Sequence, residues 1–285
     1  MTDVQPQAWA VLTAAGSGTR LGANLPKAMV EVAGAPMLAH ALSGLLASGV
    51  VERVVVTAPD QWLGQFTEVA RAAAALAGPR APGGAGEAER VRVVPGGATR
   101  QASVAAGLAE LARWAVQPGT EPAAAPAATP GGAPAQGQKA DVGHQQIVLV
   151  HDAARCLTPP ALIARVAQAV AAGHGAVVPG LPVTDTIKEV GGQGSVVQVT
   201  ATPPRAQLRA VQTPQGFTWD VLTRAHAAGT GRAGNEQDAA SDDAALAEAI
   251  GEVVAVVPGE SAALKITTPL DLYLAEKLAA DAAGN

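Results

Sequence analysis

Two cationic side chains, Arg20 and Lys27, lie close to three glycines near the N-terminus, and this combination is suited to binding phosphate groups. Gly16, Gly18 and Gly22 carry no side chains, so backbone N–H groups can approach phosphate oxygens there. Arg20 and Lys27 add fixed positive charge beside them. A glycine loop on its own is equally compatible with a tight turn that carries two solvated cations.

The spacing of these glycines argues against two familiar phosphate-binding motifs. A dinucleotide fingerprint is G-x-G-x-x-G followed by an acid about twenty residues later. Here three residues separate Gly18 from Gly22, and Glu31 and Asp60 are misplaced for a ribose contact. A P-loop needs G-K-S/T, and the chain contains no such tripeptide.

A second chemically active residue, Asp152, stands at the end of an apolar run. Residues 147–150 are Ile-Val-Leu-Val and predict a buried strand, which leads into His151-Asp152. A carboxylate at the mouth of a buried strand is costly unless it binds a cation or hydrogen-bond donors. We therefore expect Asp152 to have such partners.

The elements that must position these residues alternate between strand and helix. Such alternation predicts right-handed crossovers, a mostly parallel α/β sheet flanked by helices, and ligands at the carboxyl ends of the strands. The predicted strands are 10–14, 53–57, 90–94, 147–150, 176–178, 208–212 and 253–257, and the predicted helices are 36–48, 61–76, one from about 104, 160–172 and 269–278.

Composition limits the class of protein. With 285 residues and 48% hydrophobic content, the chain can bury a large core, and we expect one domain over 1–285. A net charge of −5 and only 2% aromatic residues argue against nucleic-acid binding. The single cysteine excludes an intrachain disulfide. With no leader-like or membrane-spanning apolar stretch, a cytoplasmic enzyme without membrane attachment is expected.

Two segments of low complexity interrupt the pattern. Residues 117–145 are rich in Ala, Pro and Gly, and proline recurs at every fourth position from Pro118 to Pro134. This spacing is incompatible with a helix and predicts a disordered or polyproline-like surface insertion without a catalytic role. Gly78–Glu89 is a shorter segment of the same kind.

The glycine loop resembles the signature A-A-G-x-G-x-R-x-G followed by P-K of nucleotidyltransferases that make activated sugars and alcohols. In these enzymes the loop wraps the triphosphate of a nucleotide, and the lysine neutralises charge that builds up during attack on the α-phosphorus. The resemblance implies catalytic roles for Arg20 and Lys27. The implied nucleotide contacts are Ala14, Ala15, Gly16 and Gly18.

A later segment, 96–104, resembles the G-G-x-x-R-x-x-S-V motif of the cytidylyltransferase branch. The resemblance implies that Gly97 and Ser103 recognise a cytosine ring. Many relatives carry an acid where this chain has Ala98. A helix start with Thr99 as its N-cap is the structural alternative.

The sequence His151-Asp152-Ala153-Ala154-Arg155 matches the 2-C-methyl-D-erythritol 4-phosphate cytidylyltransferases and the related ribitol-5-phosphate enzymes. In this family the aspartate helps to position Mg²⁺ and the acceptor alcohol, and the arginine helps to hold the substrate. The resemblance therefore implies that Asp152 contacts the nucleotide and the metal and that Arg155 contacts the substrate. His151 is expected to orient the turn rather than to transfer protons. Cys156 follows, either as a thiol activated by Arg155 or as an inert buried thiol.

Between Thr184 and Thr202, two runs rich in β-branched residues flank Gly-Gly-Gln-Gly, which predicts a β-hairpin. In the family, the segment corresponding to 182–205 is an extended arm that exchanges between two subunits. Thr186 and Arg205 match the arm residues that reach the partner's substrate, so the resemblance implies a homodimer. An isolated surface ribbon is the alternative.

Three further matches occur toward the C-terminus. Thr213 begins a T-P-Q-x-F motif and Ser241 begins a helix cap, and both are implied substrate contacts. Lys265 lies in a closing K-[IV]-T-x-P motif and is implied as a second catalytic phosphate ligand. Apart from the two low-complexity segments, the resemblance spans nearly the whole chain.

Together these motifs imply an enzyme that transfers CMP from CTP to 2-C-methyl-D-erythritol 4-phosphate, a small phosphorylated polyol, with Mg²⁺ as cofactor. The reaction releases pyrophosphate in the non-mevalonate route to isoprenoid precursors. Ribitol 5-phosphate is the alternative acceptor. A catalytically silent nucleotide-binding subunit is a third possibility, which the joint presence of Arg20, Lys27, Asp152, Arg155 and Lys265 disfavours.

Overall fold

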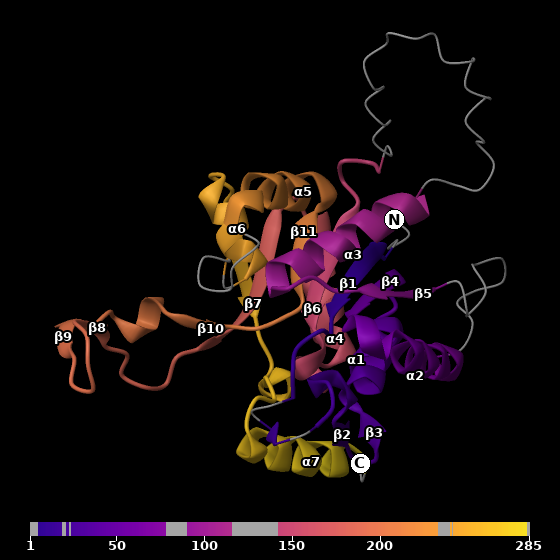
Figure 1. Cartoon of the computed structure of the whole chain (residues 1–285). Coiled ribbons are helices and arrows are strands. Elements are labelled where there is room, and N and C mark those ends of the chain that lie inside the picture. The colour runs from indigo at the N-terminus through magenta and orange to yellow at the C-terminus, as the bar shows by residue number, and fades with distance from the viewer. Residues whose placement is uncertain are drawn as a thin grey trace, which may run out of the picture.

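The computed structural model describes residues 5–18, 21–22, 24–77, 90–115, 142–232, 240 and 242–283. Arg20, Ser241, the segment 78–89 and most of 117–145 therefore lie outside the described residues. The described part forms a sheet with helices on both faces (Figure 1). Its strands are β1 (Ala8–Thr13), β4 (Val51–Ala58), β5 (Val91–Pro95), β6 (Ile147–Asp152), β7 (Ala176–Pro182), β10 (Arg209–Val211), β11 (Gln215–Thr218) and β12 (Val254–Pro258). Its α-helices are α1 (Met37–Ala47), α2 (Leu63–Leu76), α3 (Arg100–Ala115), α4 (Pro160–Ala171), α5 (Trp219–Ala228), α6 (Asp243–Ala249) and α7 (Pro269–Ala283).

The sheet confirms the predicted mostly parallel α/β arrangement. Its strand order is β10-β7-β11-β6-β1-β4-β5, with β12 pairing to β7. Strands β6, β1, β4 and β5 are parallel to their neighbours in this set, as is β12 to β7. Strands β10 and β11 run antiparallel. Strand β11 was not predicted, because its four residues Gln-Gly-Phe-Thr lack the apolar run of the other strands.

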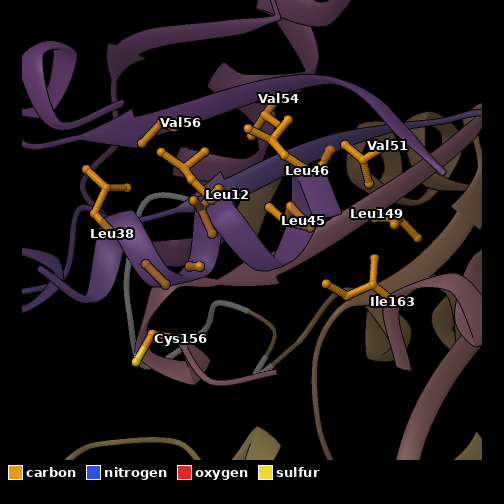
Figure 2. Packing of buried hydrophobic residues seen from close by; sticks show 14 of the residues in the cluster. Leu12, Leu38, Leu45, Leu46, Val51, Val54, Val56, Leu149, Cys156 and Ile163 are labelled. Carbon is orange, nitrogen blue, oxygen red and sulfur yellow. The ribbon is translucent and has the colours of Figure 1, made fainter. Parts of the chain in front are cut away.

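Strand β1 is buried on both faces, as expected for the centre of a parallel sheet. Its side chains alternate, so that Leu12 faces the helices α1, α2 and α4 whereas Val11 faces α3 and α5. Figure 2 shows leucines of α1, among them Leu38 and Leu45, packed against β1 and β4. This two-sided packing fixes the strand whose carboxyl end leads into the glycine loop.

Helix α3 lies close to β1 because of a glycine. A Cβ atom added at Gly107 would meet the Cγ1 atom of Val11 at 2.5 Å, inside any normal van der Waals contact. The apolar residues Val104, Leu108 and Leu111 face the same side. The N-terminus of α3 is thereby held at the edge of the sheet where β1 and β5 end.

The predicted low-complexity segment 117–145 extends too far at its C-terminal end. Val142 is only 6% exposed and packs in the core that α3 and α5 cover. His144 and Gln146 then bond to the start of α5 through their backbone carbonyls. Residues 142–145 are thus part of the folded structure, because a buried valine and these hydrogen bonds hold them there.

Deletion of Gly119–Lys139 is expected to leave thermal stability and activity nearly unchanged. The segment has no apolar face to bury, and the entropy of closing a loop varies only slowly with its length. Calorimetric melting and the rate of the reaction that the resemblance implies, compared with the full chain, check this expectation. A marked fall in either quantity would show that the segment packs on the folded domain.

The predicted hairpin is present but its paired part is short. Strands β8 (Glu189–Gly191) and β9 (Gln198–Ala201) pair antiparallel and form an arm that projects away from the body of the molecule (Figure 1). Val190 lies directly opposite Val199, and these residues are 56% and 57% exposed.

The described chain contains no helix that is long and apolar enough to cross a membrane.

Candidate nucleotide-binding site

A cavity of about 390 Å³ opens at the carboxyl ends of β1, β5 and β6. The ends of parallel strands meet at one edge of a sheet, so loops distant in sequence share this cavity. Its walls come from 13–17 after β1, from Lys27 and Ala28, from 97–100 with Ser103, from 152–154 and from Lys265. The structure thus brings together most of the residues that the sequence singled out for nucleotide binding.

Asp152 has the partners that its position requires. Its Oδ1 atom accepts hydrogen bonds from Oγ1 of Thr13 at 3.2 Å and from Nε of Arg100 at 3.0 Å. Its Oδ2 atom is 2.8 Å from Nζ of Lys265. Burial alone would raise the pKa of Asp152, but the charges of Arg100 and Lys265 outweigh it and hold that pKa well below its usual range. The carboxylate is therefore ionised at neutral pH.

The glycine loop closes on itself and thereby places Lys27 at the cavity. The backbone N–H of Lys27 donates to the carbonyl of Gly16 at 3.1 Å, and Ser17 pairs with Pro26 in an isolated β-bridge. Ala15 and Gly16 line the cavity. Ala14 lines it too, although its N–H already donates to a carbonyl of β4.

The turn after β5 depends on glycine. The N–H of Gly97 donates to Oγ of Ser103 at 3.1 Å, and a Cβ atom at Gly97 would collide with Ala102. Thr99 accepts a hydrogen bond from the N–H of Ala102 at 3.1 Å, so it caps α3 as the structural alternative predicted. The helix cap at Thr99 does not exclude the implied base contacts, because Gly97 and Ser103 still line the cavity.

His151 and Thr213 form a support behind Asp152. Oγ1 of Thr213 accepts a hydrogen bond from the N–H of Asp152 at 3.1 Å and lies 2.9 Å from Nδ1 of His151. Burial lowers the pKa of His151 to about 4, so the imidazole is neutral. The imidazole contacts the hydroxyl that also holds the backbone of Asp152, which supports the expectation that His151 orients the turn. Thr213, implied as a substrate contact, is 5% exposed and its hydroxyl serves the same turn.

Thr213 does not line this cavity, and neither do three other implied substrate residues. Arg155 donates hydrogen bonds to the carbonyls of Ala263 at 2.7 Å and Val211 at 3.1 Å. It thereby holds the segment that precedes Lys265. Thr186 and Arg205 are exposed residues of the arm, and Arg205 donates to a carbonyl of the arm's own base at 3.0 Å. Gly18, an implied nucleotide contact, is buried in the glycine loop and does not line the cavity.

Several residues that shape the site had no expected role from the sequence. Arg100 stands in the quoted G-G-x-x-R motif, and this was the signal that could have identified it. Its Nη1 atom reaches Oδ2 of Asp243 at 2.7 Å. Gln215 is fully buried and accepts hydrogen bonds from the N–H groups of Asp243 and Ala244, both at 3.1 Å, at the start of α6. The N-cap of this helix is Asp242.

Cys156 is expected to be unreactive in the folded protein. Its side chain packs in the core and burial raises the pKa of the thiol to about 12, so little thiolate forms near neutral pH. Figure 2 shows it below α1. The thiol should resist a disulfide reagent until guanidinium unfolds the chain. Rapid labelling of the native protein would contradict this, and labelling of the unfolded chain serves as the control.

Comparison with known proteins places this geometry in one family. The family model described as 2-C-methyl-D-erythritol 4-phosphate cytidylyltransferase matches residues 8–117 and 134–280. The unmatched internal residues fall in the low-complexity segment. The enzyme of that name from Nocardia farcinica is 47% identical over 269 residues, which cover 94% of this chain and 92% of that protein. The enzyme of that name from Rhodococcus jostii is 44% identical over 99% of this chain and 100% of its own length.

A solved structure agrees with these sequence matches. The crystal structure of 2-C-methyl-D-erythritol 4-phosphate cytidylyltransferase from Thermus thermophilus is similar to this chain with a TM-score of 0.61 and 34% identity. The match covers 96% of this chain and 99% of that one. The chain therefore belongs to the 2-C-methyl-D-erythritol 4-phosphate cytidylyltransferase family.

Proposed function

We propose that this enzyme transfers CMP from CTP to 2-C-methyl-D-erythritol 4-phosphate and releases pyrophosphate. Membership of the family supports the reaction. The structural observation that carries it is the convergence of Lys27, Lys265 and the ionised Asp152 on one cavity. The volume of about 390 Å³ lies within the usual range for small-molecule sites.

The chemistry needs positioning and charge neutralisation more than proton transfer. A phosphate oxygen of the acceptor forms a bond to the α-phosphorus of CTP, and the bond from that phosphorus to pyrophosphate breaks. The acceptor phosphate is already anionic, so no strong general base is required. Lys27 and Lys265 lie where they would neutralise negative charge that develops on the phosphates. Arg20 is proposed to share this role.

The residues fit Mg²⁺ as cofactor. Mg²⁺ is usually bound through one or two carboxylates together with phosphates of the substrate. Asp152 offers an ionised carboxylate at the cavity, with Oδ2 on the side of Lys265. The bound ion would supply further neutralisation of the triphosphate. We assign Asp152 as its protein ligand.

The remaining contacts follow from the walls of the cavity. Backbone N–H groups around Ala15 and Gly16 are proposed to bind the triphosphate, and Gly97 with Ser103 the cytosine ring. Ser241 precedes the N-cap of α6 and is proposed to contact the acceptor.

We further infer that the enzyme is a homodimer whose sites are completed in trans. The arm exposes apolar side chains, including the paired Val190 and Val199 and Val196 at 87%. An exposed ribbon of this kind is normally covered by a partner. Thr186 and Arg205 lie on this arm and would reach the substrate of the other subunit.

A comparison of acceptors tests the proposed reaction. The purified chain, CTP and Mg²⁺ are incubated with 2-C-methyl-D-erythritol 4-phosphate or with ribitol 5-phosphate, and pyrophosphate is measured. We expect release with the methylerythritol acceptor and little with the ribitol one. Equal or greater release with ribitol 5-phosphate would overturn the assigned acceptor, and no release with either would overturn the activity.

A further inference from the structure

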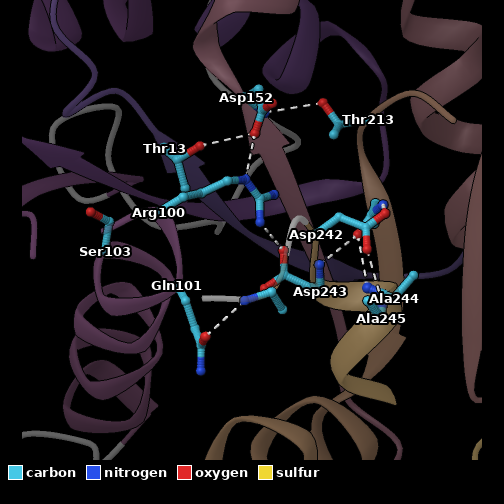
Figure 3. Close-up of polar contacts among 12 residues, drawn as sticks. Thr13, Arg100, Gln101, Ser103, Asp152, Thr213, Asp242, Asp243, Ala244 and Ala245 are labelled. Atoms are coloured by element: carbon cyan, nitrogen blue, oxygen red, sulfur yellow. Dashed lines mark hydrogen bonds and ion pairs between the residues drawn. The ribbon is translucent and has the colours of Figure 1, made fainter. Parts of the chain in front are cut away.

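A row of polar side chains runs from the cavity to helices α5 and α6, which cover the same face of the sheet as α3. Lys265 contacts Asp152 at 2.8 Å, Asp152 contacts Arg100 at 3.0 Å, and Arg100 contacts Asp243 at 2.7 Å. His226 ends the row, with Nε2 at 2.8 Å from Asp243. Figure 3 shows the Arg100 side chain lying between the carboxylates of Asp152 and Asp243.

The two cations at Asp152 occupy different settings. Lys265 approaches Oδ2 from the open side, and its side chain is 45% exposed. Arg100 approaches Oδ1 from within, and its side chain is 23% exposed. Because a guanidinium presents its donors in a rigid fork, one arginine can hold two carboxylates at once, which an ammonium does less well.

Asp243 anchors Arg100 to the body of the protein. Its side chain is 1% exposed, and its second carboxylate oxygen bonds with His226 of α5. Its backbone N–H is held by Gln215 of β11. A carboxylate buried to this degree is costly without a cation beside it. If Arg100 moved away, Asp243 would be a buried carboxylate without a cation, which is unfavourable in free energy. Lys265, by contrast, can move from Asp152 toward solvent.

We propose that Arg100 and Asp243 are positioning residues, which keep Oδ1 of Asp152 fixed so that Oδ2 stays directed at the cavity when Lys265 moves to the phosphates of CTP. This rests on the proposed function, because it needs a triphosphate and Mg²⁺ at the cavity. Oδ2 would then be released for the metal without loss of the carboxylate's orientation. Neither positioning residue is required to touch the nucleotide.

Melting of the ligand-bound protein separates this role from nucleotide binding. The melting temperature is measured without ligand, with CTP in EDTA, and with CTP and Mg²⁺. The variants are Arg100→Met, Arg100→Lys and Asp243→Asn. In each variant, CTP in EDTA should raise the melting temperature as much as in the wild type, but most of the further rise with Mg²⁺ should be lost. The reason is that only the orientation of Asp152 is disturbed.

Steady-state kinetics provide a second readout. The Mg²⁺ concentration for half-maximal pyrophosphate release should rise at least about tenfold in each variant. The double variant Arg100→Met/Asp243→Asn should be no worse than the worse single variant, because both changes interrupt one chain of contacts. Arg92→Met and Glu110→Gln are matched controls. Each change removes one partner of the 2.9 Å ion pair between Arg92 of β5 and Glu110 of α3, and neither residue lines the cavity. Both variants should show the wild-type increases in melting temperature with CTP and with Mg²⁺, and the wild-type half-saturation with Mg²⁺.

Three results would overturn the positioning role. The first is that Arg100→Lys and Asp243→Asn show the wild-type increase in melting temperature with Mg²⁺ and reach half-maximal activity at a Mg²⁺ concentration within about twofold of the wild-type value. The second is loss of the CTP increment in EDTA, which would make Arg100 a nucleotide ligand. The third is a wild type without any Mg²⁺ increment. If Asp243→Asn fails to fold, Arg100→Lys alone decides. If the wild type shows the increments but releases no pyrophosphate, the proposed reaction fails while the positioning role stands.

Discussion

Lys27→Ala and Lys265→Ala are each expected to lower the rate of pyrophosphate release by about 100-fold or more. Loss of one well-placed group that neutralises a developing charge typically costs this much in turnover. Both side chains line the cavity at the carboxyl ends of the strands. Stopped assays at saturating CTP and acceptor measure the effect on turnover directly.

Stability measurements distinguish this from misfolding. Lys27→Ala should melt close to the wild type, since a partly exposed loop cation contributes little to folding. Lys265→Ala is expected to melt somewhat lower, because it removes one of the two cations beside the buried Asp152. Lys277→Ala, on the exposed side of α7, is the matched control and should behave as wild type. Near-normal turnover in both cavity variants would contradict the assignment of Lys27 and Lys265 as phosphate ligands.

The second large effect concerns mixed dimers. Arg205→Ala and Lys27→Ala subunits should each be nearly inactive alone, yet regain activity when mixed and allowed to exchange. If each site takes Lys27 from one chain and Arg205 from the other, a heterodimer has both lesions in one site and an intact second site. Activity should reach about half of wild type per heterodimer if the sites act independently.

A second mixture controls for non-specific recovery. Lys27 and Lys265 line the same cavity of one chain. A heterodimer of Lys27→Ala and Lys265→Ala subunits therefore carries one lesion in each site and should stay inactive. If exchange is confirmed by native mass spectrometry and the Arg205→Ala mixture also stays inactive, Arg205 serves its own subunit and the trans arrangement is wrong.

The sequence predicted the parallel core because its strands are continuous apolar runs. Ile147–Asp152 is buried along its whole length and ends in a charged residue, and Val51–Ala58 is buried over most of its length and is followed by Pro59. The same local pattern pointed to Lys27 and Asp152, whereas Lys265 was implied only by the resemblance, and the three side chains do converge. Strand β11 was missed, because its pairing on both sides depends on neighbours rather than on its own residues.

The local sequence pattern could not predict the contacts that support the site. Arg100 and Asp243 are 143 positions apart, and no sequence spacing indicates that they pair. The resemblance implied that Arg155 contacts the substrate, and it gave no sign that the guanidinium also bonds to two carbonyls of the folded chain. Thr213 likewise supports the backbone of Asp152. Such contacts satisfy polar groups that only the complete fold buries.

The phosphorus spectrum of the product tests the central claim most directly. The claim is that a phosphate oxygen of the acceptor attacks the α-phosphorus of CTP and forms a phosphoanhydride bond. ³¹P NMR of the complete reaction should show two coupled doublets from one diphosphate diester, in equal amount to the pyrophosphate released. A single phosphodiester resonance beside an unchanged acceptor phosphate, or CMP with no coupled product, would contradict the account.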